Sequence, residues 1–435
     1  MERFALSRMK EWKENENRKP LIIRGARQVG KTWIMKTFGQ QYFEKTAYVN
    51  FDNNARMKQV FEGDLDIERL VLSISAETGV SIEAENTLII FDEVQEVPKA
   101  LTSLKYFYEN APQYAIVAAG SLLGVALHQG TSFPVGKVDF LDLYPLNFRE
   151  FLCAMGEKQF VSMLDSCDTQ MVTVFKTKYI ERLREYYFVG GMPEVVKDFS
   201  EKKDYNRVRA IQKNLINYYQ QDFSKHAEIK LVPRLNLVWN SIPMQLAKEN
   251  KKYIYGQVRE GSRAKDFELA IQWLLDCGLI HKVQRIQKPD LPLKAYIDFD
   301  AFKLFLVDIG LLIAMTDLDA KVIIEGNKIF TEFKGSLTEQ YILQQLISDV
   351  GVIPYYYSTQ NSKGEIDFLV QGKTSVIPIE VKAEENLKAK SLKAFCEKYK
   401  PSYAVRTSMS DYREQDWMTN IPLYAIKWIE NYVNQ

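Results

Sequence analysis

A short apolar run that leads into a glycine-rich loop constrains the fold of this chain more than any other part of its sequence. Residues 20–37 read PLIIRGARQVGKTWIMKT, and 21–23 has the apolar, β-branched character of a buried strand. The two glycines of the loop let the backbone turn its N–H groups inward, where no side chain blocks a phosphate. A helix that starts after the loop points its positive end at the same place. The segment therefore predicts a phosphate-binding loop between a strand and a helix.

The residue types in this loop suit a nucleotide polyphosphate. The Lys31 ammonium would neutralise charge on the β- and γ-phosphates, and the Thr32 hydroxyl would bind Mg²⁺. A chance glycine turn before a helix is the alternative, and the order of strand, loop, Lys-Thr and helix argues against it. The residues that we expect to bind the nucleotide are Gly25, Ala26, Arg27, Gln28, Val29, Gly30, Lys31 and Thr32.

Two carboxylates follow a second apolar strand further along the chain. Residues 87–93 read TLIIFDE, so Asp92 would hold Mg²⁺ directly or through water, and Glu93 would polarise the water that attacks the γ-phosphate. A third apolar strand, YAIVAAGS, ends in Ser121, which would lie near the γ-phosphate. No guanine-reading N-K-x-D sequence follows the loop, which favours ATP over GTP. The sequence thus predicts an ATPase, a P-loop NTP hydrolase, that uses ATP and Mg²⁺.

Length and composition fit a large protein that does not span a membrane. A chain of 435 residues is too long for one core, so roughly two to four domains are expected. The formal net charge of +1 gives no overall bias toward nucleic acid, although a local basic face is compatible with it. The four cysteines are scattered, as free thiols are. No run approaches ~18 apolar residues, and the charged N-terminus has no apolar signal-peptide core, which predicts a cytoplasmic protein without membrane contact.

The pattern of apolar residues divides the chain into four parts and predicts an α/β fold. Residues 1–150 alternate strands and helices around the nucleotide residues, which implies a mostly parallel sheet covered by helices. Helices continue over 151–224, broken at the GGMP of 190–193. Residues 225–318 combine helices with a hairpin, as a winged helix does; its few basic residues make packing within the protein the alternative to DNA contact. Residues 319–435 form the last part.

A second group of charged residues lies in this last part. Glu339 falls in a helical pattern, and Asp367 lies on a predicted strand, GEIDFLV. The next strand, IPIEVK, carries Glu380 and Lys382, which alternation places on one face of a sheet. Carboxylates and a lysine that meet in this way would hold a second Mg²⁺ and an activated water for phosphodiester cleavage. A surface salt bridge at the strand ends is the alternative.

Several of these segments resemble known protein families. GARQVGKT, LIIFDEVQ and AAGS resemble the AAA-type P-loop ATPases of bacteria and archaea that are related to the signal-transduction (STAND-like) NTPases. LDLYPLNFREF and GGMPE resemble the lid of that family. FLVDIGLL, GSLTEQYI, GEIDFLV and IPIEVK resemble its uncharacterised C-terminal domain, which is similar to the PD-(D/E)XK, or restriction-endonuclease-like, fold.

The resemblance implies four modules: a P-loop ATPase domain, a helical lid, a winged-helix-like module and a C-terminal nuclease-like α/β domain. In that family an arginine often follows the glycine that precedes the L-x-P-L-x-F-x-E-F stretch, whereas here Lys137 follows Gly136. Lysine is a poorer, monodentate partner for a γ-phosphate, so Arg149 or Arg27 would have to compensate. The resemblance implies ATPase roles for Lys31, Thr32, Asp92 and Glu93, a sensor in Ser121, contact of Pro193 with the base, and a nuclease-like core of Glu339, Asp367, Glu380 and Lys382.

Three functions stay open on the sequence. The first is an ATP-hydrolysing switch whose nuclease-like domain processes DNA or RNA. The second is an ATP-dependent regulatory switch that binds a protein partner, in which the nuclease-like fold is a catalytically inactive scaffold. The third is a nucleotide-binding scaffold with negligible turnover, against which Glu93 argues. A homo-oligomer, with an arginine supplied by a neighbouring subunit, is compatible with all three.

Overall fold

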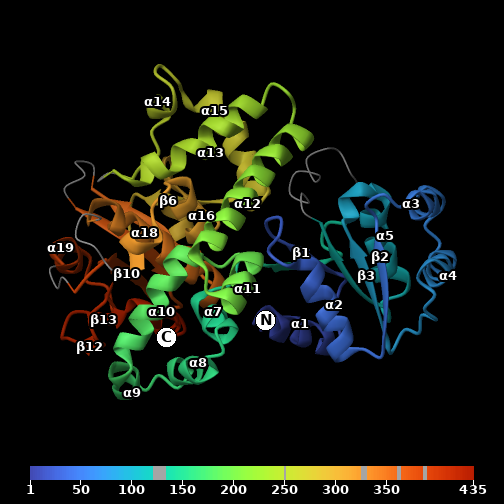
Figure 1. The fold of residues 1–435 in the computed structure, drawn as a ribbon, viewed down its shortest axis with the longest axis horizontal. Coiled ribbons are helices and arrows are strands. Elements are labelled where there is room, and N and C mark those ends of the chain that lie inside the picture. Colours follow the sequence, from blue (N-terminus) through green and yellow to red (C-terminus); the bar gives the residue numbers. More distant parts are fainter. Residues whose placement is uncertain (121–133, 249–250, 325–330, 360–363, 386–388) are drawn as a thin grey trace. The chain divides into compact units, whose positions relative to one another are not determined.

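A computed structural model of the chain describes residues 1–120, 134–248, 251–324, 331–359, 364–385 and 389–435. The chain divides into two compact units (Figure 1). The N-terminal unit comprises residues 2–144 and 276–279, and the C-terminal unit comprises 145–275 and 280–435 together with Met1. Among the helices of the described residues, none is both long and apolar enough to cross a membrane.

The N-terminal unit is built on a five-stranded sheet with the order β2-β3-β4-β1-β5, in which every pair is parallel. This confirms the predicted α/β fold with a parallel sheet. Helices cover both faces of the sheet, and α3, α4 and α5 share one hydrophobic cluster with it. The elements are β1 (Leu21–Arg24), β2 (Lys45–Asn50), β3 (Thr87–Asp92), β4 (Ala115–Ala119), β5 (Asp139–Asp142), α1 (Ala5–Glu14), α2 (Lys31–Tyr42), α3 (Ala55–Glu62), α4 (Ile67–Thr78), the 3₁₀ turn η1 (Val94–Glu96) and α5 (Pro98–Asn110).

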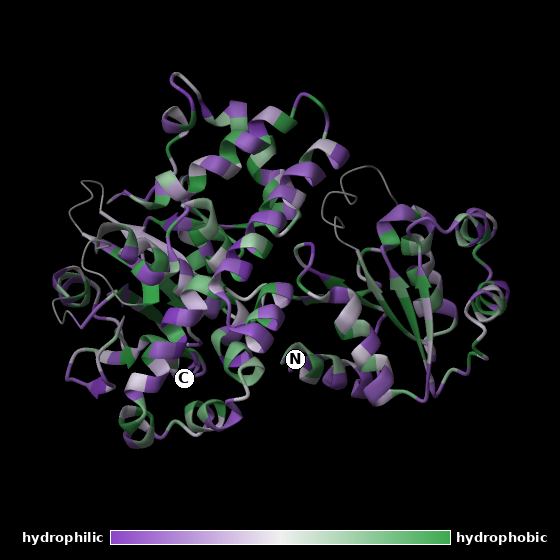
Figure 2. Cartoon of the chain, in the orientation of Figure 1, coloured by the Kyte–Doolittle hydropathy of each residue, from purple (hydrophilic) through white to green (hydrophobic). Residues whose placement is uncertain are grey.

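The inner strands of this sheet are apolar along most of their length. Every residue of β3 and β4 is buried, because strands covered on both faces cannot alternate apolar with polar residues. The strands of this unit stand out by their hydrophobic colour in Figure 2. Since parallel strands share a direction, β1 and β3 end at the same edge of the sheet, and the loop after β1 and the carboxylates after β3 are brought to that edge.

The C-terminal unit is built on an eight-stranded mixed sheet with the order β12-β13-β11-β10-β9-β8-β6-β7. The strands are β6 (Ile280–Ile286), β7 (Ile297–Leu306), β8 (Tyr355–Ser358), β9 (Glu365–Gln371), β10 (Val376–Val381), β11 (Val405–Ser408), β12 (Arg413–Glu414) and β13 (Thr419–Pro422). The helical elements are α7 (Phe148–Ala154), α8 (Lys158–Asp165), α9 (Thr169–Val174), α10 (Lys176–Val189), α11 (Pro193–Lys202), α12 (Tyr205–His226), α13 (Val232–Leu246), α14 (Tyr255–Val258), α15 (Ala264–Asp276), η2 (Leu293–Tyr296), α16 (Ile309–Met315), α17 (Ala320–Ile324), α18 (Thr331–Gln345), η4 (Leu346–Val350), α19 (Lys390–Tyr399), η5 (Leu423–Ile429) and α20 (Glu430–Val433).

The predicted hairpin of residues 225–318 forms, but it does not stand alone. Strands β6 and β7 pair with each other, and β6 also pairs in parallel with β8 of the following segment. The predicted boundary between 318 and 319 therefore separates elements that share one sheet and one compact unit. Neither the 225–318 segment nor the predicted 151–224 lid forms a unit of its own.

Two glycines between α10 and α11 pack against the start of α16. A Cβ at Gly190, where φ is +73°, would lie 2.2 Å from Asp308 Oδ1, and one at Gly191 would lie 2.1 Å from the carbonyl oxygen of Leu146. Asp308 begins α16, and its carboxylate accepts the N–H groups of Gly191 at 2.6 Å and Leu311 at 3.1 Å. Only glycine fits this close approach of two backbones, so the GGMP sequence serves the interior of the C-terminal unit.

Candidate functional site

The loop between β1 and α2 has the backbone shape that a phosphate requires. Gly25 has φ of +147°, and a Cβ there would lie 2.1 Å from the carbonyl oxygen of Leu143. Gly30, with φ of +93°, is the left-handed residue at which α2 begins. Among the described residues no side chain caps α2, and its first turn holds no acidic residue. The N–H groups at its start are thus offered to an anion without competition from a carboxylate.

Lys31 is buried within this loop. Its Nζ donates hydrogen bonds to the carbonyl oxygens of Gly25 at 2.9 Å and Ala26 at 2.8 Å. Burial lowers the pKa of Lys31 to about 8, although the charges of Glu93 and Asp92 oppose that shift. A polyphosphate that took the place of the two carbonyl groups would favour the charged ammonium and raise this pKa again. Lys31 is therefore placed to bind phosphate, and the proton on it is coupled to that binding.

The affinity for ATP is expected to fall as the pH rises above about 8. In the protein without nucleotide, Lys31 loses its proton above about pH 8. In the complex, the negative phosphates would keep Lys31 protonated, so ATP binding at high pH must take up a proton. One linked proton weakens binding by about tenfold for each pH unit between the two pKa values. Titration with a fluorescent ATP analogue from pH 7 to 9.5 measures this slope. The variant Lys31→Arg, whose guanidinium stays charged, should bind with a flat profile. Equal wild-type affinities at pH 7 and pH 9 would contradict the coupling.

The predicted metal-binding residues meet at the carboxyl edge of the sheet. The Thr32 hydroxyl at the start of α2 donates to Asp92 Oδ2 at 2.7 Å, and the N–H of Glu93 donates to Asp92 Oδ1 at 3.1 Å. Glu93 has the left-handed φ of +51°, and its carboxylate accepts a hydrogen bond from Gln95 Nε2 at 2.7 Å. Oxygen ligands of this kind suit Mg²⁺, which would neutralise phosphate charge when bound. The residues present thus fit a nucleotide with its metal ion.

Tyr48 also reaches this cluster, although it was not among the predicted site residues. It lies on β2, and its hydroxyl donates to Asp92 Oδ2 at 2.9 Å. The contact depends on β2 being the neighbour of β3 in the sheet. The one hint in the sequence was a polar side chain two residues before the end of a strand. That hint points to Asp92 only when the order of the strands in the sheet is known.

The remaining nucleotide-site predictions fall in different places. Ser121 lies outside the described residues. Pro193 is the first residue of α11 in the C-terminal unit, and its contact with a base stays a prediction. Lys137 Nζ forms an ion pair with Glu109 at 3.1 Å in the N-terminal unit. Arg27 stays in the loop, where its charge lowers the pKa of Lys31.

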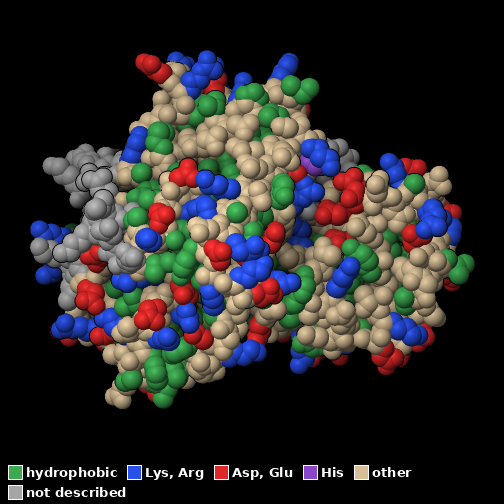
Figure 3. Space-filling model, in the orientation of Figure 1, with side chains coloured by type: hydrophobic (Ala, Val, Ile, Leu, Met, Phe, Trp, Pro, Cys, Tyr) green, Lys and Arg blue, Asp and Glu red, His purple; other side chains and the backbone are tan. Residues whose placement is uncertain are grey.

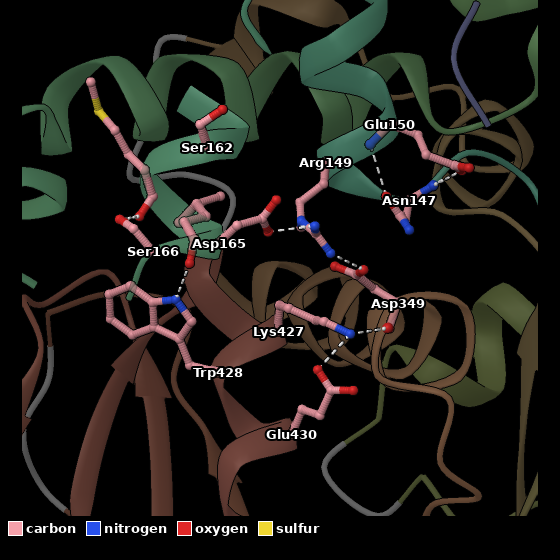
Figure 4. A network of polar contacts seen from close by, with 12 residues as sticks. Asn147, Arg149, Glu150, Ser162, Asp165, Ser166, Asp349, Lys427, Trp428 and Glu430 are labelled. Carbon is pink, nitrogen blue, oxygen red and sulfur yellow. Dashed lines mark hydrogen bonds and ion pairs between the residues drawn. The ribbon is translucent and has the colours of Figure 1, made fainter. Parts of the chain in front are cut away.

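Arg149, the other candidate to bind the γ-phosphate, is held in an ion-pair network of the C-terminal unit (Figure 4). It forms an ion pair with Asp165 and a second one with Asp349 at 2.8 Å. Lys427 donates to the carbonyl oxygen of Asp349 at 3.0 Å and pairs with Glu430 at 2.7 Å. The network joins α7, α8, η4 and η5, and the Arg149 side chain is only 12% exposed. A role at a phosphate would require it to give up both carboxylates.

The charged residues predicted in the C-terminal unit lie on α18 and at the neighbouring strands β9 and β10. Glu339 on α18 pairs with Lys251 and lies 3.6 Å from Lys303 Nζ. Lys303 on β7 is fully buried and also pairs with Glu365. Asp367 on β9 accepts the N–H of Val381 at 2.7 Å. Burial and the nearby charge of Glu339 raise the pKa of Asp367 to about 8, which favours the protonated form of this carboxyl group.

Glu380 lies on β10, and Lys382 directly follows that strand. Glu380 is buried, pairs with Lys382 at 2.6 Å, and accepts the N–H of Leu392 at 3.1 Å. This N–H belongs to the first turn of α19, whose Ala389 N-cap offers no side-chain acceptor. Glu380 therefore caps α19 from outside the helix. Within the described ranges, no three His, Cys, Asp or Glu side chains are grouped so that they could hold a metal ion.

Three segments of the chain match protein-family models. Residues 17–152 match an AAA domain, residues 180–322 match a domain of unknown function (DUF8612), and residues 334–426 match another (DUF4143). No curated protein matches significantly. Together with the loop geometry, the first match defines an AAA-type P-loop ATPase domain, which implies use of ATP and Mg²⁺.

Several solved structures resemble the chain weakly. The Walker-type ATPase of Pyrococcus abyssi is 15% identical, with a TM-score of 0.44 over 72% of this chain and 95% of that one. The Orc1 protein of Aeropyrum pernix, solved in complex with DNA, is 13% identical, with a TM-score of 0.27 over 72% and 91%. Cdc6p from Pyrobaculum aerophilum is 9% identical, with a TM-score of 0.26 over 74% and 93%. At these TM-scores we draw no functional conclusion from the resemblance.

Proposed function

We propose that this protein is an ATP-driven regulatory switch, in which the P-loop ATPase of the N-terminal unit controls the binding of a partner by the C-terminal unit. The observation that carries the proposal is the meeting of Lys31, Thr32, Asp92 and Glu93 at one edge of a parallel sheet. Lys31 and the loop N–H groups bind the β- and γ-phosphates. Thr32 and Asp92 hold Mg²⁺, and Glu93 takes the proton from the attacking water.

We further propose that the C-terminal unit binds a protein partner as a catalytically inactive scaffold. Two of the acidic side chains that a divalent cation would need, Glu339 and Glu380, are paired with lysines. Lys251 and Lys303 neutralise Glu339, and Lys303 also pairs with Glu365. Glu380 caps α19 and pairs with Lys382. A cation would have to displace buried ion pairs, and breaking such a pair costs about 3–5 kcal/mol when one partner is left uncompensated.

A Mg²⁺-dependent nuclease that acts on DNA or RNA is the second candidate, and one observation favours it. Asp367 lies close enough to Glu339 for the charge of Glu339 to raise its pKa. The repulsion between two carboxyl groups that disturb each other in this way would be relieved by a divalent cation between them.

The charge on the outer surface argues against nucleic-acid binding. On the face seen in Figure 3, Lys and Arg side chains are interspersed with Asp and Glu. On that face, the mixture of charges forms no broad basic surface of the kind that attracts nucleic acid.

The variant Asp367→Asn separates these two candidates. Because the folded pKa of Asp367 is raised above its unfolded value, the wild type loses stability as the pH rises from about 4 to 8. Asparagine does not titrate and keeps an acceptor for Val381. We therefore expect the melting temperature of the variant, relative to wild type, to rise between pH 5 and pH 8.

The same two proteins are then incubated with single- and double-stranded DNA and RNA, with Mg²⁺ or Mn²⁺ and with or without ATP. We expect no cleavage by either protein. If the wild type cleaved a nucleic acid and Asp367→Asn did not, the scaffold proposal would be rejected in favour of the nuclease. Glu384→Gln, at an exposed carboxylate after β10, is the matched control for the replacement of one carboxyl group by an amide.

A further inference from the structure

We propose that Tyr48 is a positioning residue for the Mg²⁺ of this ATPase, and that it acts through Asp92. The inference rests on the proposed ATPase function and adds a residue that neither the motifs nor the family matches assign. Tyr48 lies on β2, outside the phosphate-binding loop and outside the Asp-Glu pair. It nevertheless contacts the carboxylate that is expected to hold the metal ion.

The contacts of Asp92 show what the tyrosine does. Asp92 Oδ2 accepts the hydroxyl groups of Thr32 at 2.7 Å and Tyr48 at 2.9 Å, and Oδ1 accepts the N–H of Glu93 at 3.1 Å. A carboxylate oxygen has two lone pairs for such bonds. These three hydrogen bonds use both lone pairs of Oδ2 and one of the two lone pairs of Oδ1. The tyrosine therefore restrains the rotation of the carboxylate, whose Oδ1 would be left to bind the metal ion or its water.

The tyrosine is itself held in place from the neighbouring helix. Lys36 lies one helical turn after Thr32 on α2, and its Nζ is 3.8 Å from the centre of the Tyr48 ring. A cation over an aromatic face is attracted by about 0.5–1 kcal/mol at a partly exposed site. Contacts therefore run from Lys36 on α2 through Tyr48 on β2 to Asp92 at the end of β3.

Residues that orient a metal-binding carboxylate affect the metal more than the nucleotide. Loss of such a supporting hydrogen bond typically lowers metal affinity or activity by about 10- to 100-fold. A tyrosine that only fills space between α2 and β2 would instead affect folding, with or without Mg²⁺. The two roles therefore predict different results for the same variant.

The test is the variant Tyr48→Phe, which keeps the ring under Lys36 and removes the hydroxyl alone. Binding of a fluorescent ATP analogue is titrated at increasing Mg²⁺ and in EDTA. We expect unchanged binding in EDTA, and at least about a tenfold increase in the Mg²⁺ concentration for half-maximal Mg²⁺-dependent binding. Tyr106→Phe, at an exposed tyrosine on α5, is the matched control and should show the wild-type requirement. Lys36→Met should shift the requirement in the same direction as Tyr48→Phe, but less.

Three outcomes would overturn the inference. An unchanged Mg²⁺ requirement in Tyr48→Phe would exclude positioning through Asp92. Equal losses of binding with Mg²⁺ and in EDTA, together with a lower melting temperature, would show that the tyrosine serves packing. If the wild type did not bind the analogue under any condition, the proposed ATPase function would be wrong, and this inference with it. If the wild type binds normally, a negative result for Tyr48→Phe overturns only the role of Tyr48.

Discussion

Replacing Glu93 with glutamine is expected to abolish ATP turnover and to leave nucleotide binding intact. Glu93 follows Asp92 at the end of β3, and its left-handed backbone, with φ of +51°, turns the side chain away from the strand direction. Glutamine has the same size but cannot take a proton from water. General-base catalysis contributes typically about 10²- to 10⁴-fold, so phosphate release should fall by that range. The Kd for a fluorescent ATP analogue should change little, because the charge that binds the phosphates is on Lys31 and the loop.

The matched control for this variant lies three residues further on. Glu96 is exposed and belongs to the 3₁₀ turn that follows Glu93, so Glu96→Gln removes an equal charge from the same turn without touching the site. It should turn over ATP at the wild-type rate. If Glu93→Gln kept more than a tenth of the wild-type rate while binding normally, another group would have to be the base.

The nucleotide site was predictable from the sequence because its parts are local or follow from one rule. Gly25, Gly30, Lys31 and Thr32 lie within one turn of chain between a strand and a helix, so their positions are determined by short-range backbone geometry. Asp92 is distant in sequence, but the edge at which parallel strands end is the same for all of them. A strand pattern followed by two carboxylates was therefore enough to place it beside Thr32, where the structure has it.

Tyr48 and Lys303 could not be predicted in the same way. Tyr48 reaches Asp92 because β2 is the neighbour of β3, and strand order is not written in the periodicity of either strand. Lys303 lies in an apolar strand, where a lysine looks unfavourable until its partners Glu339 and Glu365 are known. Those partners come from α18 and β9. The energetics of a buried charge depend on tertiary pairing, which a single sequence does not specify.

The C-terminal carboxylates show a related difficulty. Alternation predicted Glu380 and Lys382 on one face of a strand; Glu380 lies on β10, Lys382 directly follows that strand, and the two form an ion pair. The sequence could not show that the N-terminus of α19 would also be there and would take the second oxygen of Glu380. Residue types alone therefore suggested a metal site, which stays a prediction; in the described contacts Glu339 and Glu380 pair with lysines, and Glu380 also caps a helix.

Replacing Asp308 with alanine is expected to destabilise the C-terminal unit by about 3 kcal/mol or more. Asp308 is fully buried, and its carboxylate accepts hydrogen bonds from Gly191, Leu311 and the Gln344 side-chain amide at 2.6, 3.1 and 3.3 Å. Each donor left buried without an acceptor costs about 1–3 kcal/mol. Chemical denaturation followed by circular dichroism measures the change, fitted with more than one transition because the chain has two compact units.

Two further variants give this prediction its controls. Asp317→Ala, at an exposed aspartate just beyond the end of α16, removes a carboxylate of the same size and should cost only about 1 kcal/mol, because its left-handed φ of +53° suits alanine less well than aspartate. Asp308→Asn keeps one acceptor oxygen, which can serve Leu311 or Gly191 but not both, and should fall between wild type and alanine. Equal denaturation midpoints for Asp308→Ala and Asp317→Ala would mean that the packing of the glycines, rather than the carboxylate, holds α10 and α11 against α16.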